Sequence, residues 1–106
     1  MNAFEVLAEP ARRRILDLVR DEERSVNELV ERLAMSQPAV SKHLRVLRDE
    51  GFVEARVDGQ RRMYHVKAEP LAEVEAWLEP YRRLWSERLD RLAQHLETTR
   101  GESGEA

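Results

Sequence analysis

The sequence predicts a mainly α-helical protein that contains one small β-hairpin. Over most of the 106 residues, apolar side chains recur every three or four positions, as they do along amphipathic helices. Between residues 52 and 66 the spacing changes to two, on either side of Asp58-Gly59, a dipeptide typical of two-residue hairpin turns. The length suits one domain with a modest core. We expect that domain to cover residues 1–97, and we expect a polar tail at residues 98–106 to fray.

The composition argues against several classes of protein. The chain has no cysteine, so disulfides, thiolate nucleophiles and thiolate metal sites are excluded. No nucleophile–base pair, paired carboxylates or glycine-rich phosphate loop indicates an enzyme, so we expect neither catalytic residues nor a cofactor. No apolar run is long enough to cross a bilayer, and the N-terminus lacks the layout of a signal peptide. We therefore expect a cytoplasmic protein with no membrane partner.

Two helices are expected at the start of the chain. The first runs from Phe4 to Ala8 and carries Phe4 and Leu7 on one side. Pro10 begins the second, because the first helical position needs no backbone N–H. The run from Arg12 to Arg14 can contact phosphate, pair with nearby acids, or do neither. The apolar face of the second helix is formed by Ile15, Leu18 and Val19.

Two further helices follow, each with a recognisable beginning. Ser25 and Glu28 have the spacing of a capping box, in which the serine hydroxyl accepts from the Glu28 N–H and the Glu28 side chain reaches back. The next helix begins at Ser36, tolerates Pro38 in its first turn, and ends at Gly51. The buried stripes of these two helices are formed by Val26, Leu29, Val30 and Leu33, and by Val40, Leu44 and Leu47.

The hairpin is expected to join strands at residues 52–57 and 60–66 through Asp58-Gly59. A two-residue turn at this position pairs Val57 with Gln60, Ala55 with Arg62, and Val53 with Tyr64. The tip of the hairpin then carries Arg56, Gln60, Arg61 and Arg62.

The last expected element is a long amphipathic helix from about residue 71 to residue 97. Its apolar residues step by three or four positions from Leu71 to Leu96. Pro80 interrupts it, and a proline inside a helix kinks or breaks it. We therefore expect either one bent helix or two helices that meet near Glu79-Pro80.

Four short helices, a hairpin and a final helix define a winged helix-turn-helix. In that fold the second helix of the pair enters the major groove of DNA, and here that helix begins at Ser36. Gln37 suits adenine, while Lys42 and Arg45 suit phosphate or guanine. Arg48, beside Asp49 and Glu50, is better explained by solvation or a surface ion pair. The candidate DNA-binding residues are Ser36, Gln37, Pro38, Ser41, Lys42, Arg45, Arg61 and Arg62.

The charge distribution supports this interpretation more than the net charge does. The chain carries a formal net charge of −3. Residues 37–62, however, contain six basic and four acidic residues, so this segment is positive. An alternative is a winged helix that binds another protein, which the negative total charge favours and the basic hairpin tip opposes.

One segment of the chain resembles the recognition helix of the ArsR-type family of arsenic- and metal-responsive repressors. It reads Ser36-Gln37-Pro38-Ala39-Val40-Ser41-Lys42-His43-Leu44-Arg45-Val46-Leu47 and is followed by Gly51-Phe52-Val53. Residues 10–16 resemble the second helix of that family, and residues 58–62 with Tyr64 resemble its wing. The likeness covers positions 3–97. It implies a dimeric repressor of double-stranded operator DNA whose terminal helices pair, and whose binding is relieved by a metal or another signal.

The chain departs from the metal-sensing members of that family. Their thiolate site would lie near residues 31–33, where this chain has no cysteine. The second family site uses Asp/His and His/Glu pairs across two terminal helices, whereas here His95 stands alone with Asp90 and Glu97 nearby. The terminal sequence at residues 77–85 resembles a cysteine-free branch instead. We therefore expect no metal ligands, and the sequence identifies no inducer.

The apolar stripe from Leu71 to Leu96 is too long for a small core to bury, and contiguous exposed apolar surface indicates a partner. The simplest partner is a second copy related by a two-fold axis. Such a homodimer places two recognition helices about 34 Å apart, which predicts an imperfectly palindromic operator. The expected interface residues are Phe4, Leu7, Leu71, Val74, Leu78, Tyr81, Trp85, Leu89 and Leu92.

Overall fold

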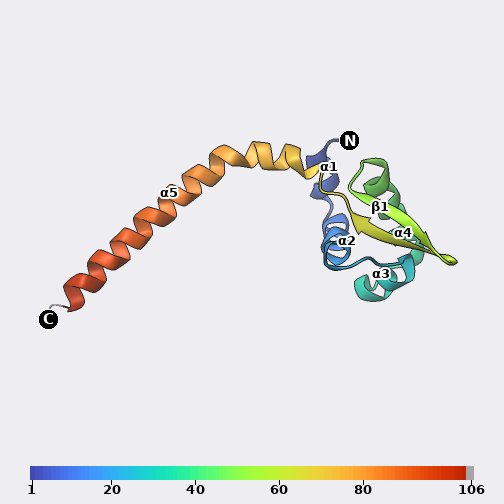
Figure 1. Ribbon diagram of the computed structural model, residues 1–106, viewed down its shortest axis with the longest axis horizontal. Coiled ribbons are helices and arrows are strands. Elements are labelled where there is room, and N and C mark those ends of the chain that lie inside the picture. Colours follow the sequence, from blue (N-terminus) through green and yellow to red (C-terminus); the bar gives the residue numbers. More distant parts are fainter. Residues whose placement is uncertain (105–106) are drawn as a thin grey trace. The chain divides into compact units, whose positions relative to one another are not determined.

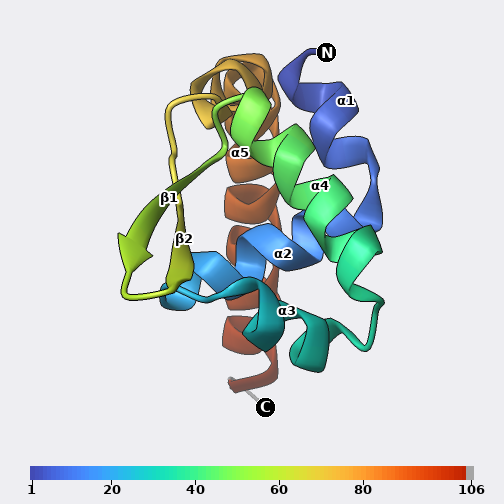
Figure 2. The same cartoon turned by 90° about the vertical axis from the view of Figure 1, so that its right-hand side faces the viewer.

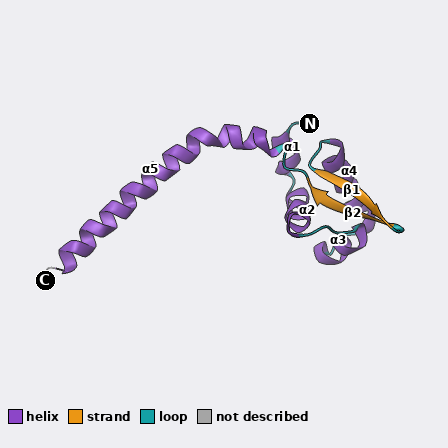
Figure 3. Cartoon of the chain, in the orientation of Figure 1, coloured by secondary structure: helices purple, strands orange, loops and turns teal. Residues whose placement is uncertain are grey.

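The computed structural model describes residues 1–104 and has the expected order of elements (Figure 1). It confirms a mainly helical chain with one antiparallel hairpin (Figure 3). The chain divides into two compact units, residues 1–74 and a second that begins at Glu75. The elements are α1 (Ala3–Ala8), α2 (Pro10–Asp21), α3 (Val26–Leu33), α4 (Gln37–Asp49), β1 (Val53–Asp58), β2 (Arg61–Val66) and α5 (Leu71–Gly104).

The first unit is a winged helix-turn-helix built around α2, which contacts α1, α3, α4 and β2 (Figure 2). The apolar stripes expected on α3 and α4 do form the core. Phe52, at the start of the hairpin, is also fully buried there. The buried helical residues include Ile15, Val19, Leu29, Leu33, Val40, Leu44 and Leu47.

Side-chain caps determine where α3 and α4 begin. The hydroxyl of Ser25 accepts from the Glu28 N–H at 3.3 Å and donates to the Glu28 carboxylate at 3.3 Å. The serine half of the predicted capping box is therefore confirmed, whereas the Glu28 carboxylate binds the serine hydroxyl instead of the Ser25 backbone N–H. The hydroxyl of Ser36 accepts from the Ala39 N–H at 3.3 Å and so caps α4.

The end of α4 is a Schellman motif, and it directs the chain into the hairpin. Gly51 has φ +82°, a conformation that favours glycine. The Gly51 N–H donates to the Arg48 carbonyl at 3.0 Å, and the Phe52 N–H donates to the Leu47 carbonyl at 2.8 Å. These bonds satisfy the last carbonyls of the helix and place Phe52 in the core.

The arginine run of α2 stabilises the end of α1. The Arg12 side chain donates to the carbonyls of Val6 at 2.7 Å and Glu5 at 3.1 Å. The Arg13 side chain donates to the carbonyl of Leu7. Two of the three arginines therefore cap carbonyls that the α1 helix leaves free, a role that was not predicted from the sequence.

The hairpin register differs from the expected one. Asp58 pairs with Arg61, Val57 with Arg62, and Ala55 with Tyr64. The two turn residues are thus Gly59-Gln60, and the predicted pairing of Val57 with Gln60 is wrong. Gly59 has φ +64°, and among the described residues Gln60 is not in the left-handed region. A positive φ at the first turn residue alone is typical of a type II′ turn, which takes glycine there.

A backbone bridge fixes the hairpin to the segment before α3. The Arg24 N–H donates to the Tyr64 carbonyl at 3.1 Å, and the Tyr64 N–H donates to the Arg24 carbonyl at 2.8 Å. The buried Arg24 side chain also donates to the Leu18 carbonyl at 2.9 Å. This bridge holds the base of the hairpin against the helix-turn-helix.

Helix α5 is one continuous helix with Pro80 inside it, and Figure 1 shows it bent in its N-terminal half. Of the two alternatives expected at Pro80, the structure therefore has one bent helix and not two separate helices. The helix continues to Gly104, through residues 98–104 that the sequence assigns to a polar tail. Residues 105–106 of that tail lie outside the described part of the chain. The division between the two units falls after Val74, within α5, and the single domain expected over residues 1–97 stays a prediction. Leu71 and Val74 pack on the core, whereas most large apolar residues after them are exposed.

The turn between α3 and α4 contains a strained residue. Ala34 caps α3 in the left-handed conformation, with φ 55° and ψ 40°. We expect Ala34→Gly to raise the free energy of unfolding by about 0.5–1 kcal/mol, because glycine adopts this conformation without a Cβ clash. Urea unfolding followed by circular dichroism measures the change.

A matched control is Ala39→Gly in the first turn of α4, where the backbone is helical. This change is expected to lower the free energy of unfolding by about 0.5–1 kcal/mol. A loss of stability in both variants would contradict the interpretation of Ala34 as strained.

Candidate nucleic-acid interface

The outward face of α4 gathers most of the predicted DNA-binding residues. Val40, Leu44 and Leu47 fix the opposite face in the core. This leaves Ser36, Gln37, Pro38, Ser41, Lys42 and Arg45 exposed. Four of these line a single shallow depression, namely Pro38, Ser41, Lys42 and Arg45.

The cations of this face are not neutralised by the protein. Within residues 1–100, whose side chains the structure describes, neither Lys42 nor Arg45 forms an ion pair, whereas Arg56 binds Glu23 at 2.6 Å. An unpaired cation on the surface can bind a phosphate without first giving up a carboxylate partner. The α4 face therefore presents its full positive charge to a polyanion.

Arg48 belongs to the same surface, although it is not among the candidate DNA-binding residues predicted from the sequence. It forms no ion pair with Asp49, Glu50 or any other described residue. It lines one depression with Ser41 and Arg45, and another with Arg62 of the hairpin. The signal was available in the sequence, because Arg48 follows Arg45 by three positions and so lies on the same helix face.

The N-terminus of α4 meets the hairpin at a further depression. Gln37 lines it together with Gln60, Arg61 and Arg62 of the hairpin. Asn27 of α3 also lines it and was not predicted. A helix N-terminus is electropositive and favours anions. The recognition helix and the tip of the hairpin thus contribute to one continuous polar surface.

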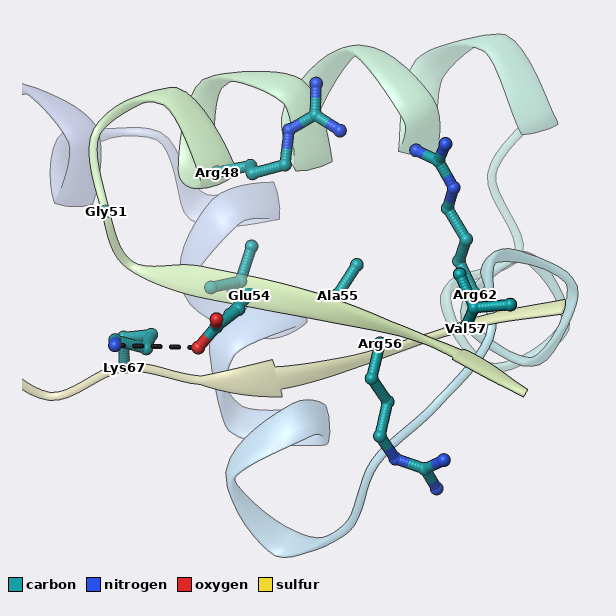
Figure 4. A pocket seen from close by; sticks show the side chains of 9 residues that line it. Arg48, Gly51, Glu54, Ala55, Arg56, Val57, Arg62 and Lys67 are labelled. Atoms are coloured by element: carbon teal, nitrogen blue, oxygen red, sulfur yellow. Dashed lines mark ion pairs between the residues drawn. The ribbon is translucent and has the colours of Figure 1, made fainter.

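The two adjacent arginines of the hairpin have different surroundings. Arg61 lies 3.7 Å from a carboxylate oxygen of Glu28 and 3.7 Å from one of Asp58. Arg62 forms no ion pair with any described residue, and its cross-strand neighbour is Val57, which is 73% exposed. Figure 4 shows Arg62 directed toward α4, on the side where Arg48 lies, and Arg56 directed away from it.

The predicted interface residues fall into two groups. Leu7, Leu71 and Val74 are half-buried and pack on the core of their own chain, and Leu78 is also half-buried. Phe4 is partly exposed. The large apolar residues left exposed on α5 include Tyr81, Trp85, Leu89, Leu92 and Leu96. Further exposed aromatic surface comes from Trp77, whose ring centroid lies 5.0 Å from that of Tyr81.

Among the side chains that the structure describes, those of residues 1–100, no group of three or more His, Asp or Glu is placed to hold a metal ion. No helix of this part of the chain is long and apolar enough to span a membrane.

Comparisons with known proteins agree with this geometry. The family model described as "Bacterial regulatory protein, arsR family" matches residues 9–55. A probable mercury resistance operon repressor from Streptomyces lividans is 44% identical over 63 residues, which are 59% of this chain and 50% of that protein. The chain spans 63% of the length of two further curated relatives.

Solved structures cover more of the chain. The crystal structure of a possible transcriptional regulator for arsenical resistance superposes with a TM-score of 0.68 and 39% identity, over 88% of this chain and 94% of that one. The solution structure of a homodimeric winged helix-turn-helix DNA-binding domain, Mb0332 from Mycobacterium bovis, superposes with a TM-score of 0.60 and 32% sequence identity. The match covers 74% of this chain and 73% of that one. Both chains are similar to this one in sequence as well as in fold.

Proposed function

The chain belongs to the ArsR family of bacterial regulatory proteins, and from this premise we propose that it is a homodimeric transcriptional repressor that binds a specific DNA operator. The observation that carries the proposal is the outward face of α4, where Lys42 and Arg45 are exposed and unpaired among the described residues. Relatives named as repressors and a homodimeric DNA-binding relative support it.

In the proposed complex, α4 lies in the major groove and its N-terminal residues reach the base edges. Gln37 can donate to and accept from adenine, and Ser41 can bind a base edge or a phosphate. Lys42 and Arg45 bind phosphates or guanine. Ser36 and Pro38 begin the helix at the DNA surface, and the hairpin lies along the flanking backbone, where Arg62 can bind a phosphate.

The proposed dimer forms through the exposed stripe of α5. Its apolar residues repeat every 11 positions, as Val74, Trp85 and Leu96 do. Such a repeat, about 3.67 residues per turn, keeps the stripe on one face of the helix. A large apolar face of this kind on a small protein is typical of a protein interface. Phe4, Leu7, Leu71, Val74 and Leu78 would contribute the surface that the core leaves exposed.

Two features of α5 favour antiparallel pairing. The spacing of Leu71, Val74 and Leu78 is mirrored by that of Leu92, Leu89 and Trp85, about a point between residues 81 and 82. An antiparallel pair centred there joins each apolar residue to its mirror residue in the second copy. One charge pair also matches, because Glu75 comes opposite Arg88 in this arrangement. A parallel pair would place like charges together.

The proposal has no catalytic step and no cofactor. The relatives are named as transcription regulators and repressors, which supports a purely regulatory role. We place that role in the cytoplasm, where operator DNA would be accessible. The two-fold dimer predicts an imperfectly palindromic operator whose half-sites lie about one helical turn apart.

Fluorescence anisotropy with a labelled random-sequence duplex at low salt tests the proposal. We expect binding that weakens by about 10³-fold or more between about 50 and 200 mM salt, because a dimer would contact six or more phosphates. No binding to duplex at low salt would favour the protein-binding alternative. Mapping of bound sites across a genome then identifies the operator and tests its palindromic form.

A further inference from the structure

The strand register separates two arginines that are adjacent in the sequence. Successive residues of a strand point to opposite faces, so Arg61 and Arg62 leave the strand in opposite directions, although both also line the depression beside Gln37. Arg61 lies between the carboxylates of Glu28 and Asp58, at 3.7 Å from each. It joins the turn of the hairpin to the start of α3. Arg62 has no such partner among the described residues.

The face that carries Arg62 forms one wall of a groove, and the C-terminal half of α4 forms the other (Figure 4). Arg48 and Arg62 supply cations from the two walls, and Val53, Ala55 and Val57 line the strand side between them. The carboxylate at the far end is already neutralised, because Glu54 lies 3.5 Å from the amine of Lys67. The remaining charge of the groove is therefore positive.

We infer that this groove holds one sugar–phosphate strand of the DNA, clamped between Arg48 and Arg62, with Val57 against the sugars. The inference rests on the proposed function and assigns a residue-level role within it. The groove is continuous with the α4 surface, since Arg48 also lines the depression that contains Ser41 and Arg45. Arg62 and Arg48 can bind phosphate without losing an ion pair, and the exposed Val57 offers an apolar contact beside them.

Arg61 does not belong to the clamp formed by Arg48 and Arg62, because it already has carboxylate partners. Its two carboxylate neighbours would repel a phosphate, and binding one would require breaking existing ion pairs. Its role is to hold the hairpin against α3. The two residues thus form a matched pair of variants that differ by one sequence position.

The test measures the salt dependence of binding for the full-length chain with a random-sequence duplex. For B-DNA, the slope of log affinity against log salt falls in magnitude by about 0.9 for each phosphate contact removed. We therefore expect Arg62→Ala and Arg48→Ala each to reduce the slope by about two per dimer and the affinity by about tenfold. Arg61→Ala should leave the slope unchanged, and Arg62→Lys should retain most of it because the charge is kept.

The outcomes separate this inference from the proposed function. If the parent chain binds with a steep salt slope while Arg62→Ala leaves that slope unaltered, the clamp is wrong and the function stands. An equal reduction by Arg61→Ala and Arg62→Ala would also overturn the clamp. A parent chain that does not bind duplex overturns both proposals. Thermal unfolding of each variant verifies that these exposed substitutions preserve the fold.

Discussion

A chain carrying Lys42→Ala and Arg45→Ala is expected to bind duplex DNA about 10²- to 10³-fold more weakly than the parent chain at moderate salt. Both side chains project from the outward face of α4 and have no ion-pair partner among residues 1–100. In a dimer the double variant removes four contacts to phosphate or base, each contributing about 1 kcal/mol or more. Neither residue contributes to the core, so the loss should occur without unfolding.

The control for this experiment removes the same charge elsewhere. Arg20 on α2 and Arg83 on α5 are exposed and already paired with carboxylates. Arg20→Ala combined with Arg83→Ala lowers the net charge equally but leaves the α4 face intact. Anisotropy titrations of the two double variants should therefore differ by about two orders of magnitude. Equal losses would mean that overall charge, and not the α4 face, controls binding.

The raised pKa of Arg20 offers no test of the surface. The hydrogen bond and charge of Asp21 raise this pKa. A raised pKa on a group that is protonated at every physiological pH adds no titration in that range. Charge substitution is therefore the informative way to test the interface.

Local sequence signals were sufficient to predict the helix-turn-helix. Ser25, Ser36 and Gly51 act through residues at most five positions away, so their caps can be predicted from spacing alone. The stripe of Val40, Leu44 and Leu47 likewise fixes which face of α4 is exposed. The candidate DNA surface on α4 follows from these local features.

The hairpin turn shows where such signals fail. Asp58-Gly59 and Gly59-Gln60 are both acceptable turn pairs, and the two resulting registers differ by two residues on the partner strand. A shift by two keeps every side chain on its original face, so the alternation of apolar and polar residues cannot distinguish them. The bridge between Arg24 and Tyr64 fixes the base of the hairpin from outside it.

Non-local contacts also explain the roles that the sequence left open. The ion pair of Arg61 with Glu28 joins residues that are far apart in the chain. Arg12 and Arg13 bind carbonyls of the preceding helix, six or seven positions earlier. Adjacent arginines are equivalent in a sequence pattern, and only the fold shows which of them remain available for phosphate.

The second large effect is expected at the proposed dimer interface. Trp85 and Leu89 are 66% and 48% exposed in the single chain, at the middle of the apolar stripe. Trp85→Glu combined with Leu89→Glu would place four carboxylates in the proposed interface of a dimer. Burying unpaired charge costs several kcal/mol, and the apolar burial of both side chains is lost as well.

We therefore expect this double variant to sediment as a monomer at concentrations where the parent chain is a dimer. Its operator affinity should fall by at least about 100-fold, because one chain engages one half-site only. Gln94→Glu is the matched control, since residue 94 lies on the opposite face of α5 from the stripe. A dimeric Trp85→Glu, Leu89→Glu variant would exclude the stripe as the interface.

The direction of pairing can be tested in the same dimer, because the chain has no cysteine of its own. Antiparallel helices centred between residues 81 and 82 bring the two copies of Tyr81 together, so Tyr81→Cys should form an intermolecular disulfide under mild oxidation. The two copies of Leu92 would then lie about 30 Å apart along the helices, far beyond the reach of a disulfide. Leu92→Cys should remain monomeric on a non-reducing gel. In a parallel pair every position faces its own copy, so both variants would cross-link and the mirrored spacing of the stripe would carry no structural meaning.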